Sequence, residues 1–416
     1  MSRHPNVELA VSRSLQSGRR RWLAAAAVLP IAAVLSEWAE PAVVVNCKAL
    51  SDWVSFASRH VQADGRVVDF DTPQRQSTSE GQSYGLFFAL VHNDRTLFDL
   101  MLSWTEVNLC AGSLATRLPA WQWGKKENDT WGVLDANSAS DADLWIAYVL
   151  LEAGRLWSHP GYLASGKAVL SMVERYEIIV LPRLGRMLLP WPRSVARGPA
   201  WRLNPSYLPL QLLRRFHQED ASGPWSELAQ NTVRMLGAIT PHGFAPDWCI
   251  WSGEEDAFST DPQQGTVGSY DAIRVYLWAG MLNAQDPAHT ALLKILYGPR
   301  RLLERGERLP EHVDTFTGLG SGIGPAGYGA ALLPYLKVQE LVSLPASRSK
   351  RLGEPDPGPI SGHFSPFIAH RATPLPYYER MLTLFGQGWL EGVFAFGKTG
   401  YLQTSWKLTC HSVQPV

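Results

Sequence analysis

Three acidic residues stand where polar segments give way to apolar ones, and each could take part in acid–base chemistry. Glu80 lies in Thr-Ser-Glu-Gly-Gln-Ser-Tyr-Gly, Asp141 in Ser-Asp-Ala-Asp and Asp271 in Gly-Ser-Tyr-Asp, and an apolar run follows each segment. Hydroxyl residues before an apolar run are typical of helix N-termini. The sequence therefore predicts three helices that each begin beside a carboxylate, and helix ends are easily gathered into one site.

The residues next to Glu80 are small. Gly81 and Gly85 would each cost a helix about 1 kcal/mol relative to alanine, so something other than helix stability favours them. The close approach of a ligand or of another backbone is the usual reason for such glycines. We therefore expect clearance beside Glu80 for a substrate chain.

The second segment holds two candidates, Asp141 and Asp143. Both suit the acidic first turn of a helix, and Asp143 is equally well interpreted as a simple cap together with Ser138 or Ser140. Residues two apart on a helix point to different faces. At most one of the two aspartates should therefore reach a site shared with Glu80, and Asp141 is our candidate.

Asp271 and Arg274 are three residues apart and can meet on one helix face. Such a pair is usually an exposed ion pair of about 0.5 kcal/mol or less. Beside Tyr270, however, the guanidinium would keep Asp271 ionised, as a general base must be. Glu80 suits the role of general acid if burial or a neighbouring carboxylate keeps it protonated. Asp141 is the candidate for that neighbour. One neutral and one ionised carboxyl group are the minimum equipment for cleaving a glycosidic bond.

Composition narrows the classes of partner. The 416-residue chain has 38 basic and 38 acidic residues, so it lacks the positive field that attracts nucleic acid. Its 11 histidines are scattered, and no His-Glu-x-x-His segment occurs, so we expect neither a metal nor another cofactor. Tryptophan has 17 copies, against 14 of phenylalanine and 13 of tyrosine. Indoles stack on the C–H faces of sugars, so some of them suit a carbohydrate cleft, while most belong to the core.

The N-terminus has the pattern of a secretory signal. Arginines at 19–21 precede the uncharged run 22–35, which is too short to span a bilayer comfortably. We expect 1–42 to be a signal peptide, with a resemblance to the twin-arginine type at 18–23 and an uncleaved membrane anchor as the alternative. Residues 43–416 would then form one catalytic domain, exported to the periplasm or secreted, without stable membrane insertion.

An exported chain can form disulfides, and this one has four cysteines. Cys47 and Cys410 lie near the two ends of the mature chain, so a disulfide between them is one open pairing. Cys110 and Cys249 have apolar neighbours and are interpreted as buried thiols.

Helical periodicity dominates the chain. Helices are predicted over 53–60, 83–93, 96–109, 141–157, 166–179, 208–217, 224–240, 271–283, 288–303, 327–342 and 377–385, and the main strand signals are at 66–70 and 392–396. Long connections rich in Pro, Gly and Trp run over 118–137 and 189–205. Repeated buried helices without β–α–β alternation predict an all-α toroid or solenoid.

Several segments, in order, resemble glycoside hydrolase family 8. Residues 139–157 resemble the family signature, with Val149 where the pattern has Ser or Ala. The segments 78–85, 118–128, 204–207, 269–276 and 384–389 resemble endoglucanases that accompany bacterial cellulose synthase. The resemblance runs from about Cys47 to Cys410 and departs from the pattern at 343–376.

The resemblance implies an (α/α)6 barrel with long loops and a few short strands, and inverting endo-hydrolysis of β-1,4-glucan. It places the acid at Glu80, the base at Asp271, and at Asp141 a residue that holds and distorts the sugar. The glucan cleft would be lined by Trp121 or Trp123, Trp201, Tyr207, Tyr270 and Arg274. The implied partners are a cellulose chain and the cellulose synthase complex, with a role in cellulose biosynthesis. Inversion requires that the carboxyl groups of Glu80 and Asp271 stand roughly 6.5–9.5 Å apart.

Two other classes of protein compete with this interpretation. Gly-Gln-Ser-Tyr-Gly at 81–85 fits the nucleophile elbow of a serine esterase, with Ser83 as nucleophile, although no buried strand precedes it. A non-catalytic glucan-binding or export protein could keep the cleft without the chemistry, but the presence of Glu80, Asp141 and Asp271 together argues against that class.

Overall fold

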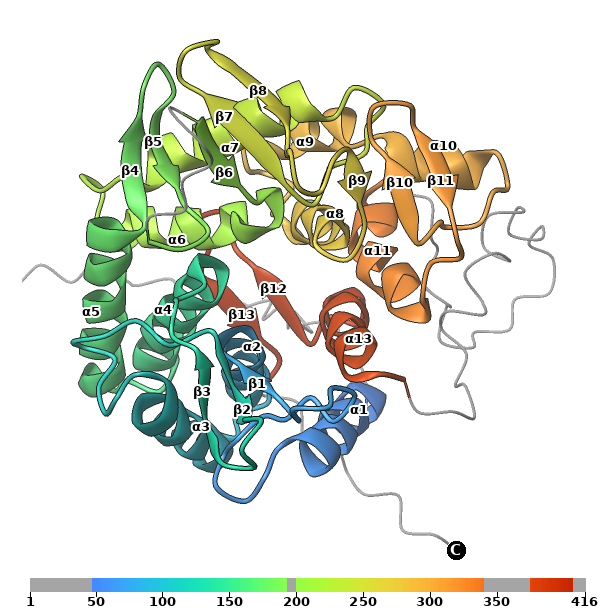
Figure 1. The fold of residues 1–416 in the computed structure, drawn as a ribbon. Helices are drawn as coiled ribbons and strands as arrows, with labels where there is room; N and C mark the ends of the chain where they lie inside the picture. The colour runs from blue at the N-terminus through green and yellow to red at the C-terminus, as the bar shows by residue number, and fades with distance from the viewer. Residues whose placement is uncertain (1–46, 193–199, 340–374, 407–416) are drawn as a thin grey trace, which may run out of the picture. The chain divides into compact units, whose positions relative to one another are not determined.

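The computed structural model describes residues 47–192, 200–339 and 375–406, and all of them belong to the unit Val44–Val416 (Figure 1). The expected signal peptide 1–42 and Cys410 lie outside the described residues, as does the side chain of Cys47. The helices are α1 (Cys47–His60), α2 (Ser79–Val91), α3 (Arg95–Leu109), α4 (Ser140–Leu156), α5 (Pro160–Tyr176), α6 (Leu210–Glu219), α7 (Trp225–Ile239), α8 (Ala272–Met281), α9 (His289–Ile295), α10 (Gly298–Glu304), α11 (Ala326–Val338) and α13 (Tyr377–Leu390), with the 3₁₀ turn η1 (Pro205–Tyr207). The strands are β1 (Ser77–Thr78), β2 (Gln122–Lys125), β3 (Trp131–Asp135), β4 (Ile178–Leu181), β5 (Gly185–Leu188), β6 (Ala200–Leu203), β7 (Cys249–Ser252), β8 (Ala257–Thr260), β9 (Val267–Gly268), β10 (His312–Asp314), β11 (Leu319–Ser321), β12 (Phe394–Phe396) and β13 (Leu402–Thr404).

The helices form an inner and an outer layer of an (α/α)6 barrel, so the predicted fold class is confirmed (Figure 1). The inner helices α2, α4, α6, α8, α11 and α13 follow one another around the barrel, and α1, α3, α5, α7 and α9 pack outside them. All residues of α8 and all of α2 except Glu80 are buried, whereas α3 buries a single face. A helix that is apolar all round belongs inside, and an amphipathic one outside.

Glycines set the closest contacts between inner helices. A Cβ at Gly280 of α8 would overlap the backbone nitrogen of Tyr335 in α11, and one at Gly386 of α13 would overlap the backbone oxygen of Ala330 in α11. Because no side chain fills either position, the three helix backbones lie in direct contact. These contacts fix the register of α8 against α11 near the C-terminal end of α8.

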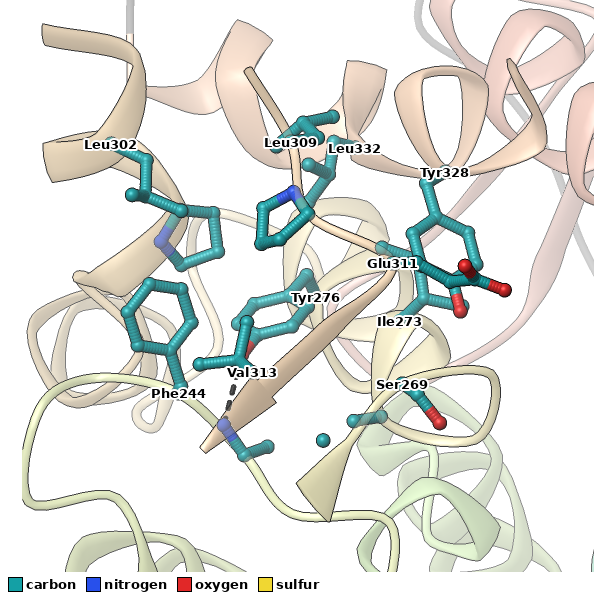
Figure 2. Close-up of a pocket in the computed structure, with 15 residues that line it drawn as sticks. Phe244, Ser269, Ile273, Tyr276, Leu302, Leu309, Glu311, Val313, Tyr328 and Leu332 are labelled. Atoms are coloured by element: carbon teal, nitrogen blue, oxygen red, sulfur yellow. Dashed lines mark hydrogen bonds between the residues drawn. The ribbon is translucent and has the colours of Figure 1, made fainter. Parts of the chain in front are cut away.

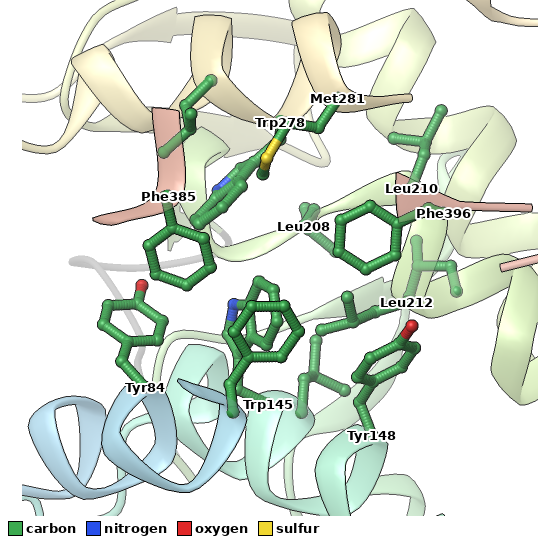
Figure 3. Close-up of a cluster of buried hydrophobic side chains, with 14 of the residues drawn as sticks. Tyr84, Trp145, Tyr148, Leu208, Leu210, Leu212, Trp278, Met281, Phe385 and Phe396 are labelled. Atoms are coloured by element: carbon green, nitrogen blue, oxygen red, sulfur yellow. The ribbon is translucent and has the colours of Figure 1, made fainter. Parts of the chain in front are cut away.

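An aromatic cluster joins the inner helices α2, α4, α8 and α13 (Figure 3). Tyr84 lies four residues after Glu80 and Trp145 four residues after Asp141, so each occupies the helix face of its carboxylate. The ring centroids of Tyr84 and Phe385 are 5.0 Å apart, those of Trp145 and Trp278 are 5.3 Å apart, and those of Trp278 and Phe385 are 5.4 Å apart. Packing of these large side chains therefore holds the N-termini of α2, α4 and α8 at one end of the barrel.

Small antiparallel sheets occupy the connections. The sheets are β1–β2–β3, β6–β7–β8, β9–β10–β11, β4–β5 and β12–β13. The predicted strand at 392–396 is confirmed as β12, but the one at 66–70 is wrong, since only Val67 forms an isolated bridge there. The connections 118–137 and 189–205 hold β2, β3 and β6. The helix predicted over 288–303 divides into α9 and α10, because Pro299 lacks the N–H that a continuous helix needs.

The described residues include the side chains of two of the four cysteines and all the helices given above. Cys110 and Cys249 are buried free thiols, as predicted. None of the helices in the described ranges is both long enough and apolar enough to cross a membrane.

Candidate active site

Arg274 gathers the three predicted carboxylates at one end of the barrel. Its Nη1 donates to Oε2 of Glu80, its Nη2 donates to Oδ1 of Asp271 at 2.8 Å, and Oδ2 of Asp141 lies 3.8 Å from Nη2. The Ser206 hydroxyl accepts a further hydrogen bond from Nη2 at 3.0 Å. The guanidinium is almost fully buried, so these are interactions in a medium of low polarity.

Glu80 is positioned by the start of α2. The N-cap residue, Thr78, is extended, and its hydroxyl accepts from the backbone N–H of Gly81 at 2.9 Å. Pairing of β1 with β2 and a hydrogen bond from the Ser79 N–H to the Trp121 oxygen fix the direction of entry into the helix. The Glu80 side chain remains 25% exposed, so a ligand at this end of the barrel can contact it.

The surroundings of Asp141 favour its protonated form. Burial, and next the negative charge of Glu80, raise the pKa of Asp141 well above its usual range, while Arg274 opposes the shift. The carboxyl group faces Glu80, and its Oδ1 accepts from the N–H of Ala142 at 2.8 Å. Asp141 therefore lies beside Glu80, where the sequence predicted a neighbouring carboxyl group.

Asp271 is held through both of its carboxylate oxygens. Oδ1 accepts from Arg274, as the spacing predicts, and Oδ2 accepts from the amide of Asn204 at 3.1 Å. Burial raises the pKa of Asp271 to about 6, Arg274 lowers it, and the charges of Asp247 and Glu80 raise it. Arg274 thus favours the ionised form as expected, but burial outweighs it, and Asp271 is ionised only above about pH 6.

Asp143 turns away from this site, as its helical position predicts. It is fully buried beside Glu177, which accepts a hydrogen bond from the Ser138 hydroxyl at 2.6 Å. Burial, and next the charge of Glu177, raise the pKa of Asp143 well above its usual range, and burial raises the pKa of Glu177 to about 7. Burial thus favours the protonated forms of the two neighbouring carboxyl groups, and the Ser138 hydrogen bond ties the segment before α4 to Glu177.

This pair makes stability depend on pH. Because the pKa of Glu177 in the folded state lies above its unfolded value, its stabilising effect is complete in mild acid and is lost as pH rises through about 7. The free energy of unfolding should differ less between pH 5 and pH 8 in Glu177→Gln than in the unmodified protein, by about 1–3 kcal/mol. Denaturant unfolding of both proteins at the two pH values measures this difference. The half-exposed Glu227→Gln is the control. Parallel pH dependences of stability in the two variants would contradict the interpretation.

The glycines beside Glu80 do not provide clearance for a substrate. A Cβ at Gly81 would overlap the hydroxyl oxygen of Tyr377, the first residue of α13, and one at Gly85 would lie 3.0 Å from Met101 and Val67. The expectation of open space is therefore wrong. The glycines admit side chains of the protein itself, and Gly81 ties the helix of Glu80 to α13.

Tyr207 lies among the carboxylates, and a second aromatic group adjoins it. Its ring centroid is 5.9 Å from the Arg274 guanidinium carbon, and 6.0 Å from the ring of Trp248. Trp248 in turn contacts Trp191, and the Arg202 guanidinium lies 4.0 Å from its ring centroid. Tyr207 joins the site as the resemblance implied, whereas Trp191 and Trp248 had no signal beyond their residue type.

The remaining aromatic candidates lie around the site. Trp121 and Trp123 stand at the start of β2, where Trp123 stacks on Trp131 with a centroid distance of 5.5 Å. Trp201 belongs to β6, three residues before Asn204, and pairs with Trp251 of β7. Tyr270 is 44% exposed, and its hydroxyl donates to Glu311 at 2.8 Å, so the aromatic ring at Arg274 is that of Tyr207.

Ser83 cannot act as an esterase nucleophile in this structure. It is fully buried inside α2, and its hydroxyl donates to the backbone oxygen of Glu80 at 2.7 Å. The nucleophile elbow requires an exposed serine after a strand of a parallel sheet, but β1 is two residues long and antiparallel to β2. In the described part of the chain, no three His, Cys, Asp or Glu side chains form a potential metal site.

Known proteins resemble this chain in sequence and in fold. The sequence model of glycosyl hydrolases family 8 matches residues 26–354. An endoglucanase of Xanthomonas axonopodis pv. citri (strain 306) is 48% identical over 389 residues, 94% of this chain and 97% of that protein, and one of Escherichia coli (strain K12) is 41% identical over 358 residues, 86% and 92%. The crystal structure of endo-1,4-D-glucanase from Vibrio fischeri ES114 is 40% identical, with a TM-score of 0.76 over 86% of this chain and 99% of that one.

The helical barrel, with its carboxyl groups gathered at one end, is the framework of a glycoside hydrolase. The chain belongs to glycosyl hydrolases family 8, a family of inverting enzymes.

Proposed function

We propose that this protein cleaves internal β-1,4 bonds of a cellulose-type glucan, with inversion at the anomeric carbon. The observation that carries the proposal is that Arg274 holds Glu80 and Asp271 on its two terminal nitrogens, with the buried Asp141 carboxyl group beside them. Support for the polymer comes from the relatives described above, which are named endoglucanases.

In the proposed reaction Glu80 donates a proton to the glycosidic oxygen as the bond from that oxygen to the anomeric carbon breaks. Asp141 supplies the proton to Glu80 and holds the sugar at the point of cleavage. Asp271, ionised above about pH 6, removes a proton from the water that attacks the opposite face of the anomeric carbon. Trp121 or Trp123, Trp201, Tyr207 and Tyr270 are the aromatic residues proposed to contact the glucan.

The test is hydrolysis of carboxymethyl-cellulose and cello-oligosaccharides by the purified protein. Endo-cleavage should lower viscosity early, before many reducing ends appear. NMR of the first product should show the α-anomer, because attack by water inverts a β-linkage. A β-anomer as first product would refute inversion. The absence of activity on every β-1,4-glucan would favour a non-catalytic glucan-binding protein.

We further propose that the enzyme is exported and acts in cellulose biosynthesis beside the cellulose synthase complex. Support comes from the arginines at 19–21, the uncharged run 22–35 and the resemblance of several segments to synthase-associated endoglucanases. In a cellulose-producing host that lacks its own copy, the full chain should restore cellulose output, whereas Glu80→Gln should not. Equal restoration by both would separate the biological role from hydrolysis.

A further inference from the structure

Asp247 makes four hydrogen bonds at the start of α8, the helix that carries Arg274 and is preceded by Asp271. Its Oδ1 accepts from the backbone N–H groups of Ser269 at 2.8 Å, Asp271 at 3.1 Å and Ala272 at 2.7 Å. Its Oδ2 accepts from the Ser269 hydroxyl at 2.5 Å. One buried carboxylate therefore satisfies N–H groups that a helix N-terminus leaves without partners inside the helix.

The residue at the N-cap position of α8 is Asp271, and its side chain makes no capping hydrogen bond. An aspartate at this position ordinarily caps its own helix with its carboxylate. Asp271 instead directs Oδ1 to Arg274 and Oδ2 to Asn204. The cap comes from Asp247, 24 residues earlier in the chain, so both oxygens of Asp271 stay with Arg274 and Asn204.

The segment that carries Asp247 is itself fixed to β9 and α8. The Asp247 N–H donates to the Val267 oxygen of β9 at 2.8 Å, and the Ala245 N–H donates to the Tyr276 hydroxyl of α8 at 2.9 Å (Figure 2). A Cβ at Gly268 would overlap the Ala245 oxygen, so the two backbones lie in contact. The pocket in Figure 2, lined mainly by apolar side chains, lies along this segment. Asp247 therefore reaches α8 from a rigid support.

We propose that Asp247 is a positioning residue of the hydrolytic site: by capping α8 in place of Asp271, it keeps the Asp271 carboxylate free for the attacking water. The inference rests on the proposed role of Asp271 as general base. It predicts that loss of the cap would let Asp271 turn back to its own helix terminus, where its carboxylate would no longer reach the water.

The charge of Asp247 gives the experiment a second readout, the pH profile of the reaction. The titratable and charged groups around Asp271 are Arg274, Asp247, Glu80, Tyr207 and Tyr378. Among these, Asp247 and Glu80 raise the pKa of Asp271, in addition to the larger effect of burial. Removal of the Asp247 charge should therefore move the acidic limb of the kcat/KM profile to lower pH.

The experiment compares Asp247→Ala, Asp247→Asn and Asp94→Ala in the full chain, once the unmodified protein has shown activity on cello-oligosaccharides. Asp94 caps α3 by accepting from the Leu97 N–H at 3.0 Å, so its alanine variant is a matched loss of a helix cap elsewhere. Asp247→Ala should lower kcat about 10–100-fold with KM changed less than about threefold. Asp247→Asn keeps an acceptor oxygen and should retain most of kcat, with the acidic limb at lower pH.

The outcomes separate the inference from the function on which it rests. If Asp247→Ala only loses stability, as expected of Asp94→Ala, with unchanged kcat and pH profile, Asp247 is a structural cap and the inference is overturned. A raised KM with unchanged kcat would overturn it as well. Should Asp247→Ala fail to fold, the pH profile of Asp247→Asn decides, and an unshifted limb refutes the proposal. An inactive unmodified protein would refute the proposed function instead.

Discussion

Glu80→Gln should lower kcat on cello-oligosaccharides by about 10³-fold or more. Glutamine cannot donate the proton that the departing sugar oxygen needs, and general acid catalysis typically contributes 10²–10⁴-fold. The amide keeps the size of the side chain and can still contact Arg274, so the fold should be retained. Initial rates of reducing-end release, with a circular dichroism melt of each protein, measure both properties.

The substrate can separate loss of the acid from general damage to the site. A 2,4-dinitrophenyl β-cello-oligosaccharide has a leaving group that departs without protonation, so Glu80→Gln should recover most of its rate on it. Glu304→Gln, on the outer helix α10 and paired with Arg300, is the matched control and should equal the unmodified protein on both substrates. Equal losses of Glu80→Gln on both substrates would argue against its role as acid.

Asp271→Asn should also lower kcat by about 10³-fold, but its loss should persist on the activated substrate. Water must still be deprotonated whatever the leaving group, and asparagine cannot accept that proton. Substantial recovery on the dinitrophenyl substrate would assign Asp271 a role other than base. Asp256→Asn, at a half-exposed ion pair with Arg234, provides the matched control.

The same residue sets the expected response to pH. Because Asp271 must be ionised to act and burial raises its pKa to about 6, kcat/KM should rise with pH up to about 6 and then level off. Below that value each unit of acidification should reduce kcat/KM about tenfold. The residual activity of Asp271→Asn should lack this limb, and a limb retained in the variant would place the titrating group elsewhere.

The helices and the three polar segments before them could be predicted because both are local in sequence. An apolar run with a hydroxyl residue before it predicts a helix start without knowledge of its neighbours. The starts of α4 and α8 lie within one residue of those predicted, and α2 begins four residues earlier than predicted, but only α2 has a hydroxyl side chain as its cap. The family resemblance implied that the three carboxylates share one site, but only the contact of Asp271 with Arg274 was predicted. The contacts of Glu80 and Asp141 with Arg274 depend on aromatic packing between helices far apart in the chain.

The parts that could not be predicted depend on distant partners. Asp247 has no helix beginning beside it, and the helix it caps starts 25 residues later, so no local pattern marks it. Gly81 admits Tyr377, almost three hundred residues away in sequence, and a glycine alone does not say what will approach it. The pairing of β1 with β2 joins residues about 45 apart, which turned an expected loop into a sheet.

Helix α8 is clamped at both ends, by the Asp247 carboxylate before Ala272 and by the backbone contact of Gly280 with Tyr335. A segment held in this way has little freedom to open alone, so its amide hydrogens should exchange only through unfolding of the whole barrel. Asp271 and Arg274 then belong to the slowest-exchanging part of the molecule. Heating should accordingly abolish hydrolysis in the same transition that melts the helices, with no earlier stage in which the enzyme is folded but inert.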